Sequence, residues 1–461
     1  MNWQTAVNSI PQNILTFAND IARNGGETWA VGGWVRDILA GRNPKDVDLE
    51  VTGVSVDTFE TLPYWNVSPA GHRMGVYLVS AGTGCEAFEV ALPQTRERFG
   101  PGHADERAVV DTSLSITESL ARRDFTMNAM AVNIITGGFV DPFLGENDLL
   151  NGVLREVDPV NFALDPVRVL RGMRFVSTHS LTPTQSVINS AREFVNLGWH
   201  IDDNRMRTEW EKWSRSASPA NGIRFLVDTG WIAIFPALAA LADVDQDPIW
   251  HPEGSVLNHT ILALDNVNSN DPIVTWAVLL HDIGKVVCTV TDGDAITSPG
   301  HASAGADMVP DTMRQFGFDI PVTRVPQWVQ AIANLVNEHM WLMSFNTNPS
   351  NTAIRRMARR IAPATVAQWA QVAFCDVFGR DRTPDQDTGW QIVRTAERAA
   401  EMHIAQTAPQ PIVMGRHLID MGMRPGPHFG AILDAAMDAQ MAGEFATLED
   451  GIAWVWNTFG N

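Results

Sequence analysis

The sequence predicts an α+β fold, with a mixed sheet and helices in the N-terminal third and an all-helical remainder. Runs of alternating apolar and polar residues, which are typical of strands, occur early in the chain, at residues 45–51, 76–80 and 86–92. Residues 176–245 instead have helical patterning. At 461 residues the chain is too long for one ordinary core, so we expect three domains or a few more.

Composition limits the class of protein. Hydrophobic residues make up 45% of the chain and charged residues 19%, which is typical of a soluble globular protein. Cys85, Cys288 and Cys375 lie far apart without a Cys-x-x-Cys pair, which favours a reducing compartment. The N-terminus lacks the pattern of a signal peptide, and the longest apolar run, residues 231–244, is too short to cross a bilayer. We therefore expect a cytoplasmic protein with no membrane partner.

The formal net charge of −20 bears on nucleic-acid binding. Phosphate contacts usually supply much of the affinity of a protein for nucleic acid, and an acidic body opposes them. If the protein binds RNA, a local basic patch must make the contact, and the affinity should be modest and sensitive to salt.

The first predicted element is a strand, a tight turn and a helix, in that order. An apolar run at residues 28–31 predicts the strand, and Gly32 and Gly33 after it allow a tight turn. Residues 34–40 have helical spacing, and Gly41 is a suitable C-terminal stop. The strand therefore ends at a turn whose backbone a ligand can approach closely.

Two carboxylates follow on the next predicted strand, residues 45–51. Residues two apart in a strand point to the same side, so Asp46 and Asp48 should aim their carboxylates at one point. Two hard oxygen ligands beside a Gly-Gly turn suit Mg²⁺ and a triphosphate. Asp-x-Asp also occurs by chance on solvated strands, and taken alone this alternative is the more common one.

The Gly-Gly-x-x-Arg-Asp motif upstream, which contains Arg36, changes this balance. Together with Asp46 and Asp48 it resembles the signature of the polymerase-β-like nucleotidyltransferases, in the branch of bacterial tRNA nucleotidyltransferases and poly(A) polymerases. The resemblance implies a nucleotidyltransferase head with a mixed sheet. It also favours Glu89, on the predicted strand 86–92, as a third catalytic carboxylate. A surface glutamate on an edge strand is the alternative.

A polar segment and then a basic motif come next. Residues 94–120 are predicted to form a mobile loop, and such loops are frequent lids over nucleotide sites. Arg122 and Arg123 offer two guanidiniums for phosphates, and Asp124 and Asn128 offer a carboxylate and an amide for a ribose. A salt-bridged helix start is the alternative. The string Arg-Arg-Asp-Phe-Thr-Met-Asn-Ala resembles the second motif of the same family, which implies nucleotide binding.

A helix with a basic side is predicted after residue 164. Asp165 suits its N-cap and Pro166 its first position. Arg168, Arg171 and Arg174 then recur every three residues, and so lie on one side. Either this side is a solvated basic stripe, or it binds the nucleotide.

Base recognition supplies a reason for the second reading. Cytosine and adenine each present an amino donor next to a ring-nitrogen acceptor, which an Asp acceptor beside an Arg donor complements. Asp165 and Arg168 could therefore accept CTP and ATP while excluding GTP and UTP, whose reversed pattern would leave buried groups unpaired. The stretch resembles the Glu-Asp-x-x-Arg motif of class II CCA-adding enzymes, with Leu164 in place of the Glu. That departure puts CTP/ATP selectivity in question.

A second set of possible metal ligands lies between residues 251 and 376. Histidines with carboxylates suit a transition metal that activates water, although a lone histidine on a helix is more often only a satisfied polar group. The order of the set, with the string His-Asp-Ile-Gly-Lys, resembles the HD phosphohydrolase superfamily. The residues are His259, His281, Asp282, His301, His339 and Asp376.

The resemblance extends over nearly the whole chain and implies four domains. The last of them resembles the C-terminal helical module of the same transferase family and implies tRNA binding. The expected domains are a nucleotidyltransferase head at 1–156, a helical neck with the base-reading helix at 157–245, an HD domain at 246–385 and the C-terminal module at 386–461.

The implied activity is template-independent addition of CCA to the 3′ end of tRNA from CTP and ATP, by nucleotidyl transfer with two metal ions held by Asp46 and Asp48. The resemblance implies Mg²⁺ at the head, a transition metal or Mg²⁺ at the HD site, and a phosphohydrolase side activity there. Three alternatives remain: a poly(A) polymerase, an enzyme that adds only CC or only A, and an HD phosphohydrolase with an RNA-binding head. The sequence does not predict the oligomeric state.

Overall fold

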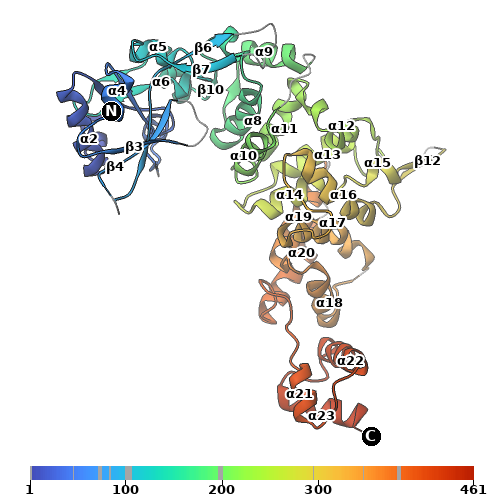
Figure 1. Cartoon of the computed structure of the whole chain (residues 1–461). Helices are drawn as coiled ribbons and strands as arrows, with labels where there is room; N and C mark the ends of the chain where they lie inside the picture. The colour runs from blue at the N-terminus through green and yellow to red at the C-terminus, as the bar shows by residue number, and fades with distance from the viewer. Residues whose placement is uncertain are drawn as a thin grey trace. The chain divides into compact units, whose positions relative to one another are not determined.

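A computed structural model of the whole chain describes residues 3–44, 46–70, 75–82, 85–98, 106–195, 201–293, 295–345, 347–381 and 386–460 (Figure 1). The chain divides into two compact units. The first contains residues 1–201 and 225–231, and the second contains residues 202–224 and 232–461.

The first unit is built on a seven-stranded mixed sheet with the strand order β3-β4-β5-β2-β1-β8-β9. The pairing of β2 with β5 is parallel, and the other pairings within this sheet are antiparallel. These strands are β1 (Glu27–Val31), β2 (Leu49–Thr52), β3 (Asn66–Pro69), β4 (Val76–Ser80), β5 (Phe88–Ala91), β8 (Ala131–Asn133) and β9 (Phe139–Val140). Two small sheets accompany it, formed by β6 (Gln94–Arg98) with β7 (Glu106–Val110) and by β10 (Val153–Leu154) with β11 (Thr182–Pro183).

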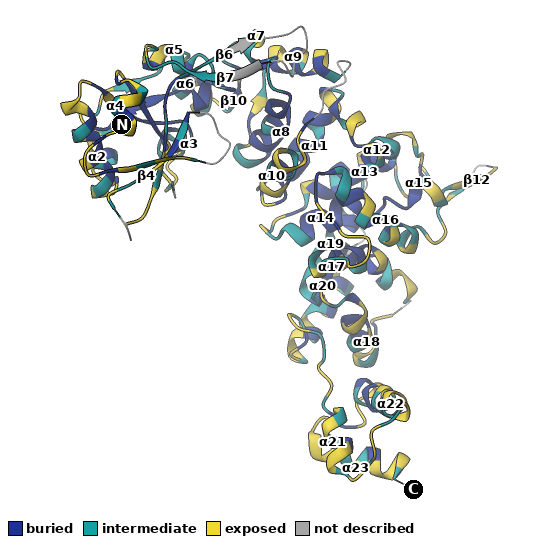
Figure 2. Ribbon diagram, viewed as in Figure 1, coloured by how far each residue is buried: buried dark blue, intermediate teal, exposed yellow. Residues whose placement is uncertain are grey.

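The helices of the first unit are mostly short. They are α1 (Trp3–Val7), α2 (Gln12–Arg23), α3 (Gly33–Leu39), α4 (Val56–Glu60), α5 (Ile116–Leu120), η1 (Thr126–Asn128), α6 (Gly145–Leu150), α7 (Pro159–Phe162), α8 (Val167–His179) and α9 (Gln185–Val195). The amphipathic helix α2 turns Phe17 and Ile21 into the core between helices and sheet, where Phe17 meets Phe59 and Trp65 edge to face. The buried strands β1 and β2 therefore form a rigid base for the loops at their ends (Figure 2).

The second unit is helical apart from the hairpin of β12 (Val290–Asp292) and β13 (Ala295–Thr297). Its elements are α10 (Asp203–Trp213), α12 (Pro236–Ala239), η3 (Ala240–Asp243), α13 (Val256–Asp265), α14 (Pro272–Leu280), α15 (Lys285–Cys288), α16 (His301–Gln315), α17 (Gln327–Glu338), η4 (Trp341–Ser344), α18 (Asn351–Ile361), α19 (Val366–Phe378), α20 (Gln386–Glu401), α21 (Gly415–Asp420), α22 (His428–Ala442) and α23 (Leu448–Phe459). The chain passes between the units three times, first at residues 201–202 and then within α11 (Pro219–Asp228) and η2 (Trp231–Ile234).

Helix α14 is apolar all round, as expected of a helix enclosed by others, and it packs against α13, α17 and α19. The last three helices have a small apolar core of their own, which includes Val413, Leu418, Phe445 and Val455. Among the described residues, none of the helices combines the length and the apolar character that crossing a membrane requires. The predicted α+β class, with a sheet-containing head and a helical remainder, is confirmed.

Two local predictions were wrong. The predicted strand at 45–51 begins only at Leu49, so Asp46 and Asp48 lie in the loop before β2. The predicted loop at 94–120 contains the paired strands β6 and β7 and the capped helix α5; its residues 99–105 lie outside the described residues. Ser115 and Glu118 form a capping box at the start of α5, which is the local signal that the composition of this stretch concealed.

Candidate functional site

The turn after β1 brings the predicted phosphate and metal residues of the head together. Gly32 has φ 60° and caps α3, a backbone conformation that favours glycine. A Cβ at Gly32 would lie 2.5 Å from Nη1 of Arg123, and a Cβ at Gly33 would lie 3.2 Å from Oδ2 of Asp48. The two glycines therefore leave room for a guanidinium and a carboxylate directly against the backbone.

Asp48 lies at the end of the sheet, next to the first residues of two strands. The N–H of Val31 donates to the Asp48 carbonyl at 2.9 Å, and the Gly33 N–H donates to its carboxylate. In the parallel pairing of β2 and β5, Leu49 lies opposite Val90, so Asp48 lies beside Glu89. Asp46 is exposed two residues earlier in the same loop.

The charges around Asp48 compete. Asp48 is exposed by its surface area, but protein atoms surround its carboxylate closely, and this desolvation raises its pKa. The positive charges of Arg123 and Arg36 oppose the rise, and the negative charge of Glu89 adds to it. Two carboxylates side by side in partly desolvated surroundings favour a bound cation, and their hard oxygens fit a divalent metal ion.

Arg123 forms an ion pair with a buried glutamate, Glu50, which was not predicted as a site residue. Nη2 of Arg123 lies 3.2 Å from Oε2 of Glu50, which is only 3% exposed. The other oxygen of Glu50 is buried without a hydrogen-bond partner. Glu50 continues the alternation of Asp46 and Asp48 by one more step, and this spacing was the available signal.

A chain of hydrogen bonds joins three of the predicted motifs. Nη1 of Arg36 on α3 donates to Oδ1 of Asn128 at 2.8 Å, and Nδ2 of Asn128 donates to Oδ1 of Asp124 at 3.0 Å. Nε of Arg171 on α8 donates to Oδ2 of Asp124 at 2.5 Å. Burial raises the pKa of Asp124, but Arg171, Asn128 and further donors outweigh it and hold that pKa well below its usual range. Asp124 is therefore an ionised anchor within this network.

Helix α8 turns its arginines inward. Arg168 and Arg174 are buried, and the guanidinium carbon of Arg174 lies 3.8 Å from the centre of the Phe175 ring. The solvated-stripe alternative is therefore wrong. Arg168 donates from Nη1 to the Asn161 carbonyl at 2.7 Å and from Nη2 to the Arg122 carbonyl at 2.8 Å.

Helix α8 begins one residue later than predicted: Pro166, not Asp165, is the N-cap residue and makes no side-chain cap hydrogen bond, and Val167 is the first helical residue. Oδ1 of Asp165 accepts from the Val167 N–H at 3.2 Å, and Pro166 lies immediately ahead of the helix. Base selection by Asp165 and Arg168 stays a prediction, and Arg168 is partly committed to main-chain carbonyls in this structure.

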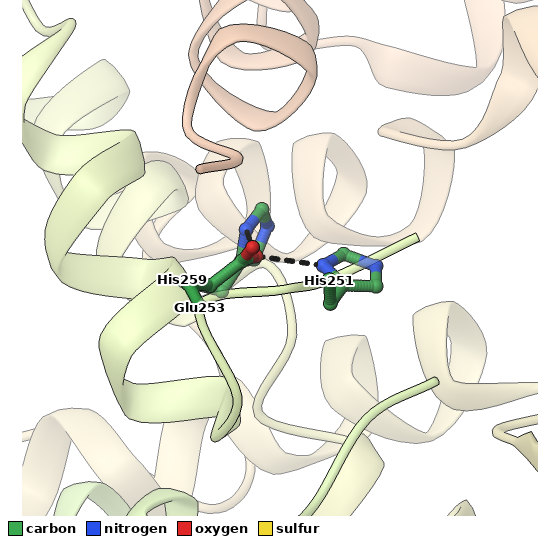
Figure 3. Close-up of side chains that lie close together, drawn as sticks. All are labelled: His251, Glu253 and His259. Carbon is green, nitrogen blue, oxygen red and sulfur yellow. Dashed lines mark hydrogen bonds and ion pairs between the residues drawn. The ribbon is translucent and has the colours of Figure 1, made fainter. Parts of the chain in front are cut away.

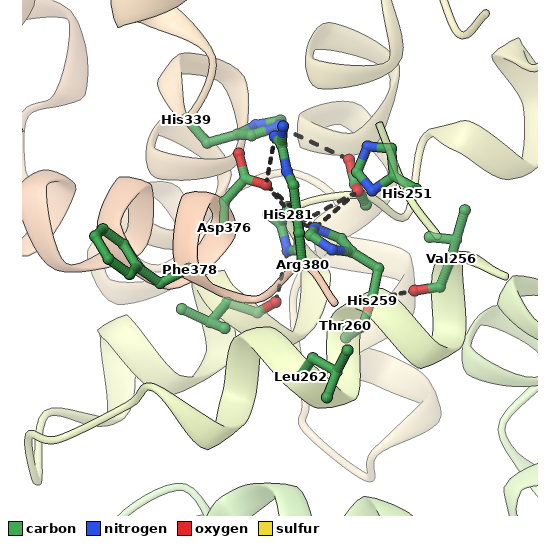
Figure 4. Close-up of polar contacts among 12 residues, drawn as sticks. His251, Val256, His259, Thr260, Leu262, His281, His339, Asp376, Phe378 and Arg380 are labelled. Atoms are coloured by element: carbon green, nitrogen blue, oxygen red, sulfur yellow. Dashed lines mark hydrogen bonds and ion pairs between the residues drawn. The ribbon is translucent and has the colours of Figure 1, made fainter. Parts of the chain in front are cut away.

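In the second unit, the predicted histidines and aspartates converge from five helices or their ends. Figure 4 shows four of them, His259, His281, His339 and Asp376. His259 lies on α13 and Asp376 on α19, His281 and His339 follow the last residues of α14 and α17, and His301 begins α16. Two groups form. The first contains His259, His281 and Asp376, and the second contains Asp282, His301 and His339.

Asp282 connects the two groups. Its Oδ2 lies 3.2 Å from Nε2 of His281, and its Oδ1 lies 3.3 Å from Nε2 of His301. Within the groups, the Nε2 atoms of His259 and His281 are 3.2 Å apart, and those of His301 and His339 are 3.3 Å apart. All four imidazoles thus direct Nε2 toward the carboxylates and toward one another.

The opposite edges of these rings show which nitrogen carries the proton. The Nδ1 atoms of three of them donate to main-chain carbonyls, which only accept: His281 to Val278 at 2.8 Å, His301 to Ser298 at 2.8 Å and His339 to Val336 at 2.6 Å. In the neutral rings, Nε2 then carries no proton and presents a lone pair. The Nε2 lone pairs of His301 and His339, 3.3 Å apart beside the buried carboxylate of Asp282, repel each other unless a cation lies among them. The donor set therefore fits a metal ion.

His259 is held by a residue that was not among the predicted ligands. Oε1 of Glu253 accepts from Nδ1 of His259 at 3.0 Å and from Nδ1 of His251 at 2.9 Å (Figure 3). Burial lowers the pKa of His259, but Asp376 and Glu253 outweigh it and raise that pKa to about 9. The second set of possible metal ligands begins in the sequence with the string Trp-His-Pro-Glu at 250–253, but His251 and Glu253 were not among the residues predicted to bind the metal.

A cavity of about 560 Å³ opens beside this cluster. Its lining includes Trp250, His251, Lys285, His301 and Arg380. Nζ of Lys285 lies 2.7 Å from Oδ2 of Asp282, and Nη2 of Arg380 lies 3.4 Å from Oδ1 of Asp376. The cavity beside the cluster therefore contains two cationic side chains, each paired with a carboxylate of the cluster, together with Asp247.

Comparison with known proteins gives related sequences. Residues 28–155 match the family model described as "Poly A polymerase head domain". The chain is 30% identical to the "Multifunctional CCA protein" of Azoarcus sp. over 392 residues, which is 81% of this chain and 90% of that protein. It is 34% identical to the protein of the same name from Halorhodospira halophila over 291 residues, 61% of this chain and 67% of that one. The chain therefore spans about two thirds of the second relative and nearly all of the first.

Among solved structures, the chain is similar to the Bacillus stearothermophilus CCA-adding enzyme in complex with CTP. The TM-score is 0.63 at 22% sequence identity, and the match covers 97% of this chain and 96% of that one. At this identity the likeness concerns the fold, which is shared along nearly the whole chain.

Proposed function

We propose, from the premise that the chain belongs to the family of multifunctional CCA proteins, that it adds CCA to the 3′ end of tRNA from CTP and ATP. The observation that carries the proposal is the convergence of the Gly32–Gly33 turn, Asp48 and Arg123 at one end of the head sheet. The glycines of this turn have no side chains, so a guanidinium and a carboxylate can lie directly against the backbone. Such a turn suits a nucleoside triphosphate with its metal ion.

Nucleotidyltransferases of this type use divalent metal ions. Asp46 and Asp48 would hold Mg²⁺ here, with Glu89 beside Asp48. Bound there, the metal would lower the pKa of the tRNA 3′ hydroxyl and stabilise the leaving pyrophosphate. Arg123 and Arg122 bind phosphate oxygens, and the turn at Gly32 positions the triphosphate by its backbone.

The network around Asp124 fixes the walls of the nucleotide site. Arg171 and Asn128 both donate to this carboxylate, and Arg36 donates to Asn128. These hydrogen bonds hold α3, η1 and α8 at fixed distances from one another. Asp165 and Arg168 at the start of α8 select the base by their acceptor and donor pattern. The lost carboxylate at Leu164 makes this the part of the mechanism that most needs a test.

The test is incubation of the pure protein with Mg²⁺ and a tRNA transcript that lacks its 3′ CCA. Each nucleoside triphosphate is supplied singly and then CTP with ATP, and products are resolved at single-nucleotide length. Two additions from CTP and one terminating addition from ATP are expected. A long run of A on any RNA would establish the poly(A) polymerase alternative, and only CC or only A would establish a partial enzyme.

We propose a second activity, metal-dependent phosphoester hydrolysis, at the histidine–aspartate cluster. The supporting observation is the set of Nε2 lone pairs around Asp282, open to a cavity that contains Lys285 and Arg380. A transition metal or Mg²⁺ held by His259, His281, Asp282 and Asp376 would supply an activated water, and the second group around Asp282 could hold a further ion. Lys285 and Arg380 orient the phosphate.

Paired variants separate the two activities. Replacing Asp46 and Asp48 with Ala should abolish nucleotide addition and leave metal-dependent phosphoester hydrolysis intact, and His281→Ala with Asp282→Ala should do the reverse. Loss of both activities in either pair would contradict the assignment of two separate sites.

The four-domain division and the cytoplasmic location stay predictions.

A further inference from the structure

The loop before α13 contains a buried carboxylate that serves two imidazoles at once. Oε1 of Glu253 accepts from Nδ1 of His259 and from Nδ1 of His251 (Figure 3). Its Oε2 accepts from the Asp381 N–H at 3.3 Å. The Glu253 side chain is 3% exposed. It is therefore a connection between the ligand helix α13, the loop at 251 and the chain just beyond α19.

The two imidazoles that share Glu253 face different surroundings. His259 is fully buried, and its Nε2 lies 3.1 Å from Oδ1 of Asp376 and 3.2 Å from Nε2 of His281. The side chain of His251 is 13% exposed and lines the cavity, together with Lys285 and Arg380. The two rings meet nearly at right angles, with centroids 4.8 Å apart.

The shared acceptor, Glu253, determines which nitrogen carries the proton in both rings. A carboxylate oxygen only accepts, so each ring carries its proton on Nδ1 and presents Nε2 on the opposite edge. In His259, Nε2 faces the proposed metal. In His251, Nε2 is the nitrogen that can bind a ligand in the cavity. Partners of this kind orient metal-binding histidines and make them better ligands.

We propose that Glu253 is a positioning residue for His259 in metal binding, and that His251, aimed by the same carboxylate, contacts the phosphoester substrate in the cavity. This inference rests on the proposed hydrolytic function of the cluster. It assigns to the loop 251–253 a role in both metal affinity and substrate binding, through different atoms of one hydrogen-bonded unit.

The first measurement reads metal binding without turnover. Mn²⁺ and Co²⁺ are titrated by calorimetry into the full chain, into Glu253→Gln and into His251→Ala, with exposed His428→Ala as the matched control. Glu253→Gln is expected to weaken metal binding about 10- to 100-fold, because the neutral amide is a poorer partner for two imidazole donors. His251→Ala and His428→Ala should bind metal within about twofold of the parent.

The second measurement reads substrate binding. With bis(p-nitrophenyl) phosphate at saturating metal, His251→Ala should raise KM about tenfold or more, and His428→Ala should leave it unchanged. Unaltered KM in His251→Ala would overturn its substrate contact, and a large loss of metal affinity would make it a ligand instead. Parent-like metal affinity in Glu253→Gln would overturn the positioning role.

A third measurement uses the parent protein alone and so does not depend on a variant folding. Long-range proton–nitrogen NMR spectra of histidine-labelled protein should show His251 and His259 protonated at Nδ1. Protonation of either neutral ring at Nε2 would contradict the shared acceptor. If the parent binds no metal at all, the proposed hydrolytic site itself fails, which differs from every outcome for Glu253.

Discussion

At the scale of single residues, Glu50 is the group whose substitution tests the triphosphate site most directly. Glu50→Gln should raise the KM for CTP about tenfold, because the loss of one charge-assisted hydrogen bond, about 1.5 kcal/mol, frees the Arg123 guanidinium from the Gly32 turn. Steady-state kinetics of CTP addition measure it. Glu193→Gln on α9 makes the same charge change in the same unit and should leave KM unaltered. An unchanged KM in Glu50→Gln would show that Arg123 needs no support.

Asp124 gives a prediction about pH and stability. Its pKa is depressed in the folded protein, so its ionised form stabilises the fold above the unfolded pKa of about 3.9, and this contribution is lost as the pH falls further. Asp124→Asn leaves Arg171 without its counter-charge and should cost about 3 kcal/mol at pH 7. The difference between variant and parent should shrink below about pH 4, as measured by denaturant unfolding. A difference that stays constant down to pH 3 would contradict the ionised anchor.

Residue types were predictable where the chemistry repeats within a short stretch, and not where it depends on distant partners. Local sequence motifs identified four of the site residues: Asp46, Asp48, Arg123 and Asp124. Glu50 continues the local alternation of Asp46 and Asp48, but its partner Arg123 comes 73 residues later, in the turn after α5, and only the folded structure reveals their contact.

At the scale of elements, the strand predicted at 45–51 begins only at Leu49, after both carboxylates, for a physical reason. Ala30 is the last residue of β1 that pairs with β2, opposite Leu49, and the chain turns away at Gly32. Asp48 keeps one main-chain hydrogen bond to Val31, but the ladder has no partner beyond it. Alternation of residue types therefore continued past the point where a neighbouring strand could support it.

Gly284, in the His-Asp-Ile-Gly-Lys string, lets α16 pack against the start of α15. A Cβ there would lie 2.0 Å from the His301 carbonyl oxygen and 2.5 Å from the Gly305 nitrogen, both of them backbone atoms. Its φ of −68° is open to any residue, so the effect of Gly284→Ala is steric alone. The variant should lose metal binding at the cluster and destabilise the second unit by about 2 kcal/mol, because His301 must move away from Asp282.

Gly430, which has no atom within 4 Å of an added Cβ and lies in α22, is the matched control. Gly430→Ala should be neutral or stabilising by about 0.5–1 kcal/mol. Calorimetric metal titration and thermal unfolding of both variants measure the difference. Normal metal affinity in Gly284→Ala would show that α16 tolerates displacement without losing His301 from the cluster.

At the scale of the whole molecule, the order of sheet and helices was readable from the sequence, but the division into compact units was not. Residues 225–231 belong with the first unit although they follow residues 202–224 of the second. Phe225 is the cause in part, because its ring lies against Gly172 of α8, where a Cβ would meet it at 2.9 Å. A return of this kind depends on packing between α8 and α11, which neither periodicity nor composition records.

Each unit has its own core, so metal binding at the histidine–aspartate cluster should stabilise the second unit and leave the first unaffected. At a free metal concentration of about 100 times Kd, the linked gain is about 2.7 kcal/mol. Mn²⁺ should therefore raise the unfolding temperature of one calorimetric transition, and EDTA should return it. In the variant with Asp46→Ala and Asp48→Ala this shift should persist, because the head carboxylates take no part in it. In the variant with His281→Ala and Asp282→Ala it should vanish. A shift that followed the head substitutions instead would mean that the buried imidazoles are held together by hydrogen bonds alone, and that the metal of this protein acts only in nucleotide addition.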